Sequence, residues 1–428
     1  MQEAGRKTTI PLTGADCFIW VLEKFNKVVG ASGNTCRYLL EVEGKVDFAA
    51  FHELITTSPE LQFLSSLQIR RANPFSRAYW LPKAPTEIPV EQHVTDEFIP
   101  KIVLERKFIT EQKMLFFFDV LYRSNGNTCI IFSWNHLLLD GFGAALLLRK
   151  LNNPVQSINM LPVDGAKQSF PSLKEATIAK FFIGKSSNKS LSGFTPRRRH
   201  KQVQQAIRII TFSKQETQHI ERLCPKLGAR FGPSPLFFAA SARAVKEILS
   251  ARGLSVQYLF APAPQNVRKK GAVGPVVGNH LSFLFYLLSS AQLTSLPQCV
   301  QAVNDQMVQQ VKAGMPQSYN ELMRYLKHVP QWLYNYYISG KWGKTLSSFA
   351  FTVAEDHPPE LMNFVGHRVI NALSFPPNIY PPGLTFAFMR FNGQLQLMAL
   401  SYKETLTDKE FDILENCIRA DLSQPLPA

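Results

Sequence analysis

The chain has 428 residues, of which 45% are hydrophobic and 11% aromatic, so it can bury large cores and is expected to form two domains. This composition excludes a disordered tail or a low-complexity scaffold. Lys and Arg number 47 against 32 Asp and Glu, a formal net charge of +15, and no apolar run is long enough to span a bilayer. The first ten residues contain no apolar segment of the secretory type, so a cytoplasmic location is expected.

The cysteines show no spacing typical of a metal site. The six lie at positions 17, 36, 129, 224, 299 and 417, mostly in apolar surroundings and without any CxxC pair. We therefore expect reduced, structural thiols, no bound metal and no bound cofactor.

The first half predicts a mixed layer of helices and strands. A helical apolar pattern covers residues 15–26, a strand is expected over 35–42, and Asp47 is a good cap for the helix that follows. Residues 73–100, rich in proline and aromatic side chains, predict a surface loop with an edge strand. Apolar runs at 114–122 and 130–134, separated by a Ser-Asn-Gly-Asn turn, predict a hairpin.

The stretch NTCIIFSWNHLLLDGFGAALLLRK, residues 127–150, places His136 and Asp140 where a buried strand gives way to a helix. A histidine at a strand end is held by packing yet can face a cleft, and its ordinary pKa of about 6.5 suits it to accept a proton near neutral pH. Asp140 can cap the helix or accept a cation, and Gly141 would permit close backbone approach. A core histidine followed by an ordinary Asp cap would show the same spacing.

Residues 153–202 lose periodicity and have the composition of a linker. From 176 to 215 the chain contains no acidic residue and many basic ones. A solvated segment is one interpretation; a weak contact with an anionic membrane surface, or with the phosphates of a CoA-type donor, is the other. Nucleic acid is not expected as a partner, because aromatic interleaving and a binding motif are missing.

The second half predicts strands at 206–212, 258–263, 281–288, 347–353 and 385–400, the last turning at Asn392 and Gly393. Helices are expected after Ser213, which has Glu216 at capping-box spacing, and over 236–249, 296–312, 320–337 and 408–418. Arg268, in a polar loop, is the most attractive bidentate partner for Asp140. The alternative is a solvated cation beside two lysines.

The segment NHLLLDG resembles the HHxxxDG motif of the thioester-dependent acyltransferase superfamily, which includes chloramphenicol acetyltransferases, condensation domains and bacterial wax ester synthases. The resemblance implies that His136 is the general base and that Asp140 belongs to a structural ion pair, with Gly141 completing the motif. Asn135 replaces the first histidine. That residue is not the base in the family, so catalysis is still expected.

Three further blocks resemble the wax ester synthase branch in the same order, covering residues 10 to 420. They are PLTGADCFIWVLE, NVRKKGAVGPVVGNHLSFLFYLL and PPGLTFAFMRFNGQLQLMALSY. The second block implies that Asn279 and Ser282 line the cleft, where an amide or hydroxyl can donate to a developing oxyanion. The alternative is that both residues are polar only because they lie at the start of a strand, which explains them nearly as well. The family's PLW-type block and its Asn-Asp pair are replaced, which leaves the substrate open.

We therefore predict an α/β (α+β) fold of two chloramphenicol-acetyltransferase-like subdomains with a tunnel at their interface. Residues 1–152 form the first, 153–202 a basic crossover linker and 203–428 the second. The expected activity is O-acyl transfer from acyl-CoA or an acyl carrier protein to an alcohol, by a monomer, in lipid or natural-product metabolism. No GxSxG elbow or triad pattern is present, so no covalent nucleophile is expected. The alternatives are amide formation, a carrier-dependent condensation enzyme and a non-catalytic docking relative.

Overall fold

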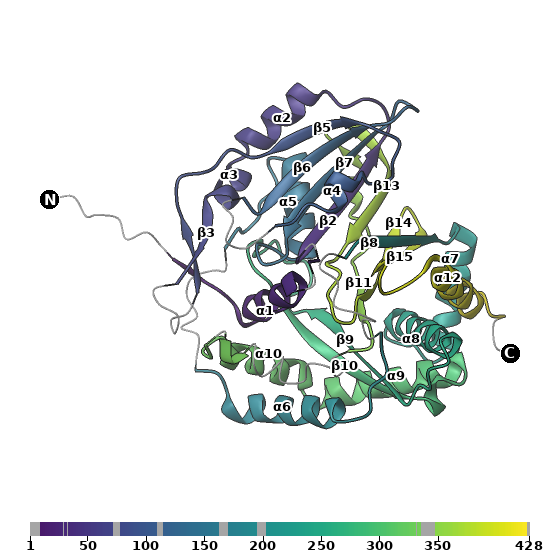
Figure 1. Cartoon of the computed structure of the whole chain (residues 1–428). Coiled ribbons are helices and arrows are strands. Elements are labelled where there is room, and N and C mark those ends of the chain that lie inside the picture. Colours follow the sequence, from purple (N-terminus) through teal and green to yellow (C-terminus); the bar gives the residue numbers. More distant parts are fainter. Residues whose placement is uncertain are drawn as a thin grey trace.

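The computed structural model describes residues 9–28, 30–31, 33–71, 78–108, 114–161, 170–194, 203–330, 332–334 and 347–425 (Figure 1). The helices are α1 (Gly14–Val28), α2 (Phe48–Thr57), α3 (Pro59–Ser66), α4 (Lys101–Leu104), α5 (Gly141–Asn152), α6 (Leu173–Ser187), α7 (Lys214–Lys226), α8 (Ser234–Ala251), α9 (Leu296–Lys312), α10 (Met315–Leu326) and α12 (Asp408–Leu422). The strands are β1 (Ile10–Pro11), β2 (Thr35–Val42), β3 (Leu67–Arg70), β4 (Tyr79–Pro82), β5 (Val90–Val94), β6 (Phe116–Tyr122), β7 (Thr128–Asn135), β8 (Gln205–Thr211), β9 (Tyr258–Asn266), β10 (Leu281–Ser289), β11 (Ala350–Val353), β12 (Asn363–Phe364), β13 (His367–Phe375), β14 (Leu384–Phe391) and β15 (Gln394–Tyr402). None of the described helices is long and apolar enough to cross a bilayer.

The first large sheet has six strands in the order β12-β13-β2-β7-β6-β5. The expected hairpin is present as β6 and β7, and β5 lies at the edge, parallel to β6. Every residue of β7 is buried, and the ring of Phe132 stacks on that of Phe118 in β6 and on that of Trp134 in its own strand. This packing fixes the end of β7, where the motif begins.

The second sheet has the order β11-β14-β15-β8 and carries a separate core under α8, α9 and α12 (Figure 1). The turn between β14 and β15 has Asn392 at φ 49° and Gly393 at φ 76°. Both values lie in the left-handed region that a two-residue hairpin turn with a right-handed twist requires. The predicted closing hairpin is therefore confirmed.

Strand β13 crosses from the second half of the chain into the first sheet. It pairs antiparallel with β2, so that β2, almost entirely buried, lies between two neighbours instead of forming an edge. The predicted subdomain of residues 203–428 thus lends two strands, β12 and β13, to the sheet of the other half. No local pattern in the sequence indicates this exchange.

The stretch 153–202, whose composition indicated a linker without periodic structure, contains helix α6. Ser172 caps this helix by accepting from the backbone N–H of Glu175. Ala179 of α6 packs against Met315 and Tyr319 of α10, and α6 lies on the outside of the molecule beside α10 (Figure 1). Helix α10 runs from Met315 to Leu326, so it begins earlier than the helix predicted over 320–337, and residues 327–330 form a turn instead of continuing it; residues 331 and 335–337 lie outside the described residues.

Strands β9 and β10 form a two-stranded antiparallel ribbon. The outer edge of β10 meets helix α9, where two glutamines bind its main chain. Gln310 accepts from the N–H of Phe285 and donates to its carbonyl, at 3.0 and 2.7 Å, and Gln306 does the same for Leu287, at 3.0 and 2.9 Å. Strand β10 begins at Leu281, two residues after Asn279, so the ribbon carries the second half's contribution to the motif loop.

Candidate active site

The backbone of His136 is held from both sides at the end of β7. Its N–H donates to the carbonyl of Asn34 at 2.7 Å, and its carbonyl accepts from the side-chain amide of Asn279 at 2.8 Å. The residue is partly exposed, while its ring Nδ1 is buried without a hydrogen-bond partner among the described residues. Nε2 is therefore the nitrogen that an approaching group can reach.

Burial lowers the pKa of the His136 imidazole from its ordinary value of 6.5. The carbonyl of its own residue, the charge of Asp140 and the side chain of Asn279 act in the opposite direction but do not reverse the shift. Burial favours the neutral ring because a charged imidazole loses its hydration there. His136 is thus in its proton-accepting form at neutral pH.

Asp140 joins the two halves of the chain. It caps α5 by accepting from the N–H of Gly143 at 2.9 Å, and it accepts from both terminal nitrogens of Arg268, at 2.8 and 3.1 Å. A further bond comes from the N–H of His280 at 3.1 Å. These four hydrogen bonds occupy the carboxylate's capacity, so Asp140 acts as a clamp that fixes the loop after His136.

Arg268 is committed to this clamp and does not lie in solvent. Its side chain is 3% exposed, and it also donates to the carbonyl of Pro275 through Nη2 at 2.8 Å. The guanidinium carbon lies 4.8 Å from the ring centre of Phe142. The ion pair proposed from the sequence is therefore present, with bidentate geometry.

Asn135, which replaces the motif's first histidine, faces the protein interior. Its amide donates to Glu23 and to the carbonyl of Phe108, both at 3.1 Å, and its oxygen accepts from the N–H of Leu137 at 2.8 Å. The residue is fully buried. It shapes the turn that carries His136 and takes no position from which it could reach a substrate.

Asn279 is a positioning residue. One N–H of its amide donates to the carbonyl of His136, and the other donates to Asp16 at 2.9 Å. Since an amide has two N–H groups, neither is left for a developing oxyanion. The structure therefore gives no support for that role, although Asn279 does contact the backbone of His136.

Asp16, on α1, was missed by the sequence analysis. Its Oδ1 accepts from both the backbone and side-chain nitrogen of Asn279, at 2.7 and 2.9 Å, and its Oδ2 accepts from the N–H of Thr13 at 2.7 Å. Burial raises the pKa of the Asp16 carboxyl. Only its place in the N-terminal PLTGADC block pointed towards it, because its partner lies 263 residues away.

Ser282 lies deeper than expected. Its hydroxyl is buried and donates to the carbonyl of Pro316, at the start of α10, at 2.5 Å. The hydrogen of this hydroxyl is thus used to join β10 to α10. The geometry places Ser282 in helix packing rather than among donors aimed at a substrate.

The motif was expected to allow close backbone approach at Gly141. In the structure this close approach occurs at Gly143 instead. A Cβ atom added at Gly143 would lie 2.5 Å from the carbonyl oxygen of Val276, whereas one added at Gly141 would meet nothing within 4 Å. The second glycine of the helix therefore lets the two halves of the chain touch.

We expect Gly143→Ala to lower the free energy of unfolding by about 1–3 kcal/mol, because backbone must move to relieve the contact. Gly141→Ala is the matched control in the same helix turn and should be neutral or slightly stabilising, since alanine favours helix. Urea unfolding of both variants measures the difference. Equal stability of the two would contradict the close contact.

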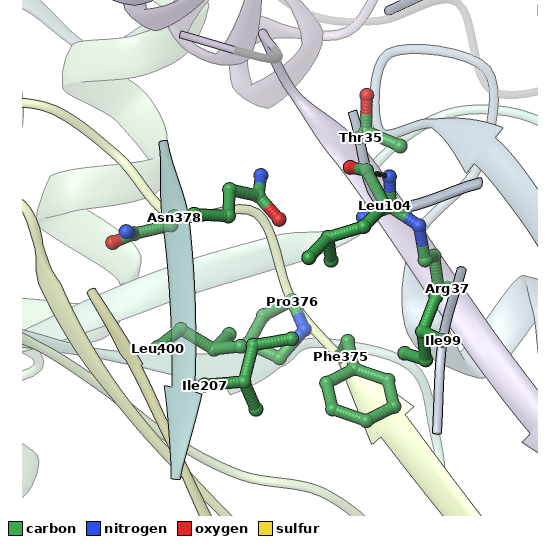
Figure 2. Close-up of a pocket in the computed structure, with 10 residues that line it drawn as sticks. Thr35, Arg37, Ile99, Leu104, Ile207, Phe375, Pro376, Asn378 and Leu400 are labelled. Atoms are coloured by element: carbon green, nitrogen blue, oxygen red, sulfur yellow. Dashed lines mark hydrogen bonds between the residues drawn. The ribbon is translucent and has the colours of Figure 1, made fainter. Parts of the chain in front are cut away.

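Two of the cavities bounded by described residues have no wall formed by His136. The first, of about 10 Å³, holds no more than a water molecule and lies between β2, β8 and the end of β13 (Figure 2). Thr35, in its lining, pairs across the ladder with Asn135. The second, of about 420 Å³, lies between α6, α9 and β10. Neither is lined by His136, so the tunnel expected at that residue stays a prediction.

One group of side chains among the described residues has the composition of a metal site, namely Glu91, His93 and Asp119. Arg106 donates to Asp119 at 2.5 Å and to Glu91 at 3.0 Å, and His93 bonds Asp119 at 3.1 Å. A guanidinium between the two carboxylates supplies the positive charge that a metal ion would bring. The cluster is therefore an ion-pair network on the edge of the first sheet.

Comparison with known proteins gives matches in structure only. No family model and no curated protein matches the sequence. The trichothecene 15-O-acetyltransferase from Fusarium sporotrichioides aligns with a TM-score of 0.70 at 12% identity over 99% of this chain and 96% of its own. The first condensation domain of the CDA synthetase gives 0.65 at 13%, over 99% and 98%.

A third match is the starter condensation domain of rhizomide synthetase in complex with C8-CoA, with a TM-score of 0.64 at 16% identity, over 98% of this chain and 96% of its own. Identities this low show the fold alone, and the particular resemblance to wax ester synthases stays a prediction from the sequence. The fold prediction is confirmed: the chain has the two-subdomain, chloramphenicol-acetyltransferase-like fold of condensation domains and of this acetyltransferase.

Proposed function

We propose that this protein is an acyltransferase that moves an acyl group from a thioester to a hydroxyl acceptor, with His136 as the general base. The observation that carries the proposal is the placement of His136: a neutral, partly exposed imidazole on a loop that Asp140, Arg268 and Asn279 fix from both halves of the chain. A base must be both unprotonated and positioned, and this site meets both requirements.

In the proposed step, Nε2 of His136 accepts the hydroxyl proton while the acceptor oxygen attacks the thioester carbonyl carbon. The resulting tetrahedral intermediate collapses as the carbon–sulfur bond breaks. The imidazolium returns its proton to the leaving thiolate, so that a free thiol and an ester leave the site and His136 is neutral again. Asp140 stabilises the transient imidazolium through its charge, since that charge raises the pKa of His136.

The fold neighbours support thioester chemistry of this kind without fixing the acceptor. One is an O-acetyltransferase and another was crystallised with C8-CoA. Several are condensation domains, so amide formation or a carrier-bound donor is the second candidate. A non-catalytic docking relative is the third.

The deciding experiment measures free-thiol release from short to long acyl-CoAs, each with an alcohol mixture and, separately, an amine mixture. Release that depends on alcohol supports the proposal, and release that depends on amine supports the second candidate. If CoA esters give no release, the same assay with acyl carrier protein as donor follows. Absence of turnover with either donor would contradict an acyltransferase function.

The pH profile of the reaction gives an independent prediction. Because the pKa of His136 is lowered from 6.5, the acid limb of kcat/KM should have its midpoint below pH 6.5. In Asp140→Asn the charge that opposes this shift is removed, so the acid limb should move to still lower pH. A midpoint of the acid limb above pH 6.5 would contradict His136, with its lowered pKa, as the base.

A further inference from the structure

The outer face of α6 combines protruding apolar side chains with lysines. Lys174, Ile178, Phe181 and Lys185 follow one another at intervals of three and four residues, so they share one helical face. All four are exposed, and Phe181 has 75% of its surface in solvent. Exposed apolar side chains that are flanked by charged residues are typical of a surface that binds a partner or a membrane.

Leu173, the first residue of α6, is also strongly exposed, so the apolar groups form a row along the helix rather than a single protrusion. The opposite face of α6 is fully used in packing, with Ala179, Phe182 and Ile183 against α10. The apolar side chains of the outer row are therefore not needed for the packing of α6 against α10.

The charge of this surface has one sign. Glu175, the acid of α6, turns inward and accepts from the hydroxyl of Ser318 on α10. No ion pair joins Lys174 or Lys185 to another described residue, and the sequence contains no acidic residue between Glu175 and Glu216. A positive face without internal neutralisation attracts an anionic surface.

A groove adjoins this face. It has a volume of about 420 Å³ and lies between α6, α9 and β10, with Lys185 and Lys189 among its lining residues. Phe182, Leu287 and Met315 supply apolar wall. Cations beside an apolar hollow match the two parts of an anionic lipid, its phosphate and its acyl chain.

We propose that the outer face of α6, with this groove, binds the protein to an anionic phospholipid surface. The aromatic and aliphatic side chains enter the interfacial layer, and the lysines lie at the phosphates. Charge complementarity and the row of exposed apolar groups favour a lipid surface over an acidic protein such as a carrier. None of these residues belongs to the His136 loop, so the proposal is tested without turnover.

The test is sedimentation of the full chain with vesicles of phosphatidylcholine, alone or mixed with phosphatidylglycerol. The native protein should sediment with the mixed vesicles only, and less as salt is raised. Lys174→Gln/Lys185→Gln should weaken binding by roughly 30-fold, and Phe181→Ser by roughly ten-fold. Lys101→Gln/Lys409→Gln and Phe231→Ser are the controls, the latter because Phe231 is 74% exposed on a different element.

The proposal is overturned if the native protein ignores mixed vesicles, or if the α6 variants bind as well as their controls. It is also overturned if vesicle binding is absent while the α6 variants lose turnover with acyl carrier protein as donor, because the surface then serves an acidic protein. Thermal unfolding of each variant verifies that these exposed substitutions leave the fold intact.

Discussion

His136→Gln should lower kcat/KM for acyl transfer by about 10²–10⁴-fold, the usual contribution of a positioned general base. Glutamine keeps a polar side chain of similar reach but cannot accept a proton near neutral pH. The fold should survive, because the His136 backbone, and not its ring, makes the bonds to Asn34 and Asn279. Steady-state thiol release at saturating acceptor measures the loss.

His52→Gln is the matched control, since His52 lies exposed on α2. It should retain full activity. A His136→Gln protein with activity close to the native level would exclude this residue as the base. If the variant is inactive but also loses its cooperative unfolding transition, His136→Ala and His136→Asn serve to separate catalysis from folding.

Arg268→Ala should lower the free energy of unfolding by about 3–5 kcal/mol, as expected when one partner of a buried ion pair is removed. The Asp140 side chain is only 10% exposed and would lose two of its four hydrogen bonds. The bond from Arg268 to the carbonyl of Pro275 would go as well. Urea unfolding followed by circular dichroism measures the change.

The exposed pair of Arg368 with Glu43 supplies the comparison. Its side chains are 70% and 63% exposed and 4.0 Å apart, so Arg368→Ala should cost less than about 1 kcal/mol. Arg268→Lys keeps the positive charge but loses the bidentate geometry of the guanidinium group. Its loss of unfolding free energy should lie between those of the two alanine variants. A loss in Arg268→Ala no larger than that in Arg368→Ala would mean that the clamp does not stabilise the fold.

Features set by neighbouring residues could be predicted from the sequence. Asp47 accepts from the first N–H groups of α2, and Ser213 with Glu216 forms the expected capping box. The hairpin turn at Asn392 and the strand-to-helix change at His136 follow from the same local rules. Each depends on residues a few positions apart, whose pattern a sequence displays directly.

Features set by distant contacts were harder to predict. Arg268 could be predicted as the partner of Asp140, because a bidentate pair of an arginine and a carboxylate is able to fix the histidine loop. The link from Asp16 to Asn279, by contrast, has no local pattern. Helix α6 escaped prediction because large apolar side chains lie on both of its faces, with Phe182 and Ile183 towards α10 and Phe181 towards solvent, so the sequence shows no single apolar face. Strand β13 was missed because its pairing with β2 is set by the whole sheet.

The glutamine side chains of α9 make the main-chain hydrogen bonds with β10 that a neighbouring strand would otherwise make. Gln306 and Gln310 are four residues apart on a helix, a rise of about 6 Å, while the two strand residues they bind are about 6.7 Å apart. Because these two spacings nearly match, glutamines one helical turn apart on α9 can bind every second residue of β10. The two glutamines thereby occupy main-chain groups on the edge of β10 that another chain would otherwise be able to pair with. They also fix the position along α9 of the segment that follows Asn279.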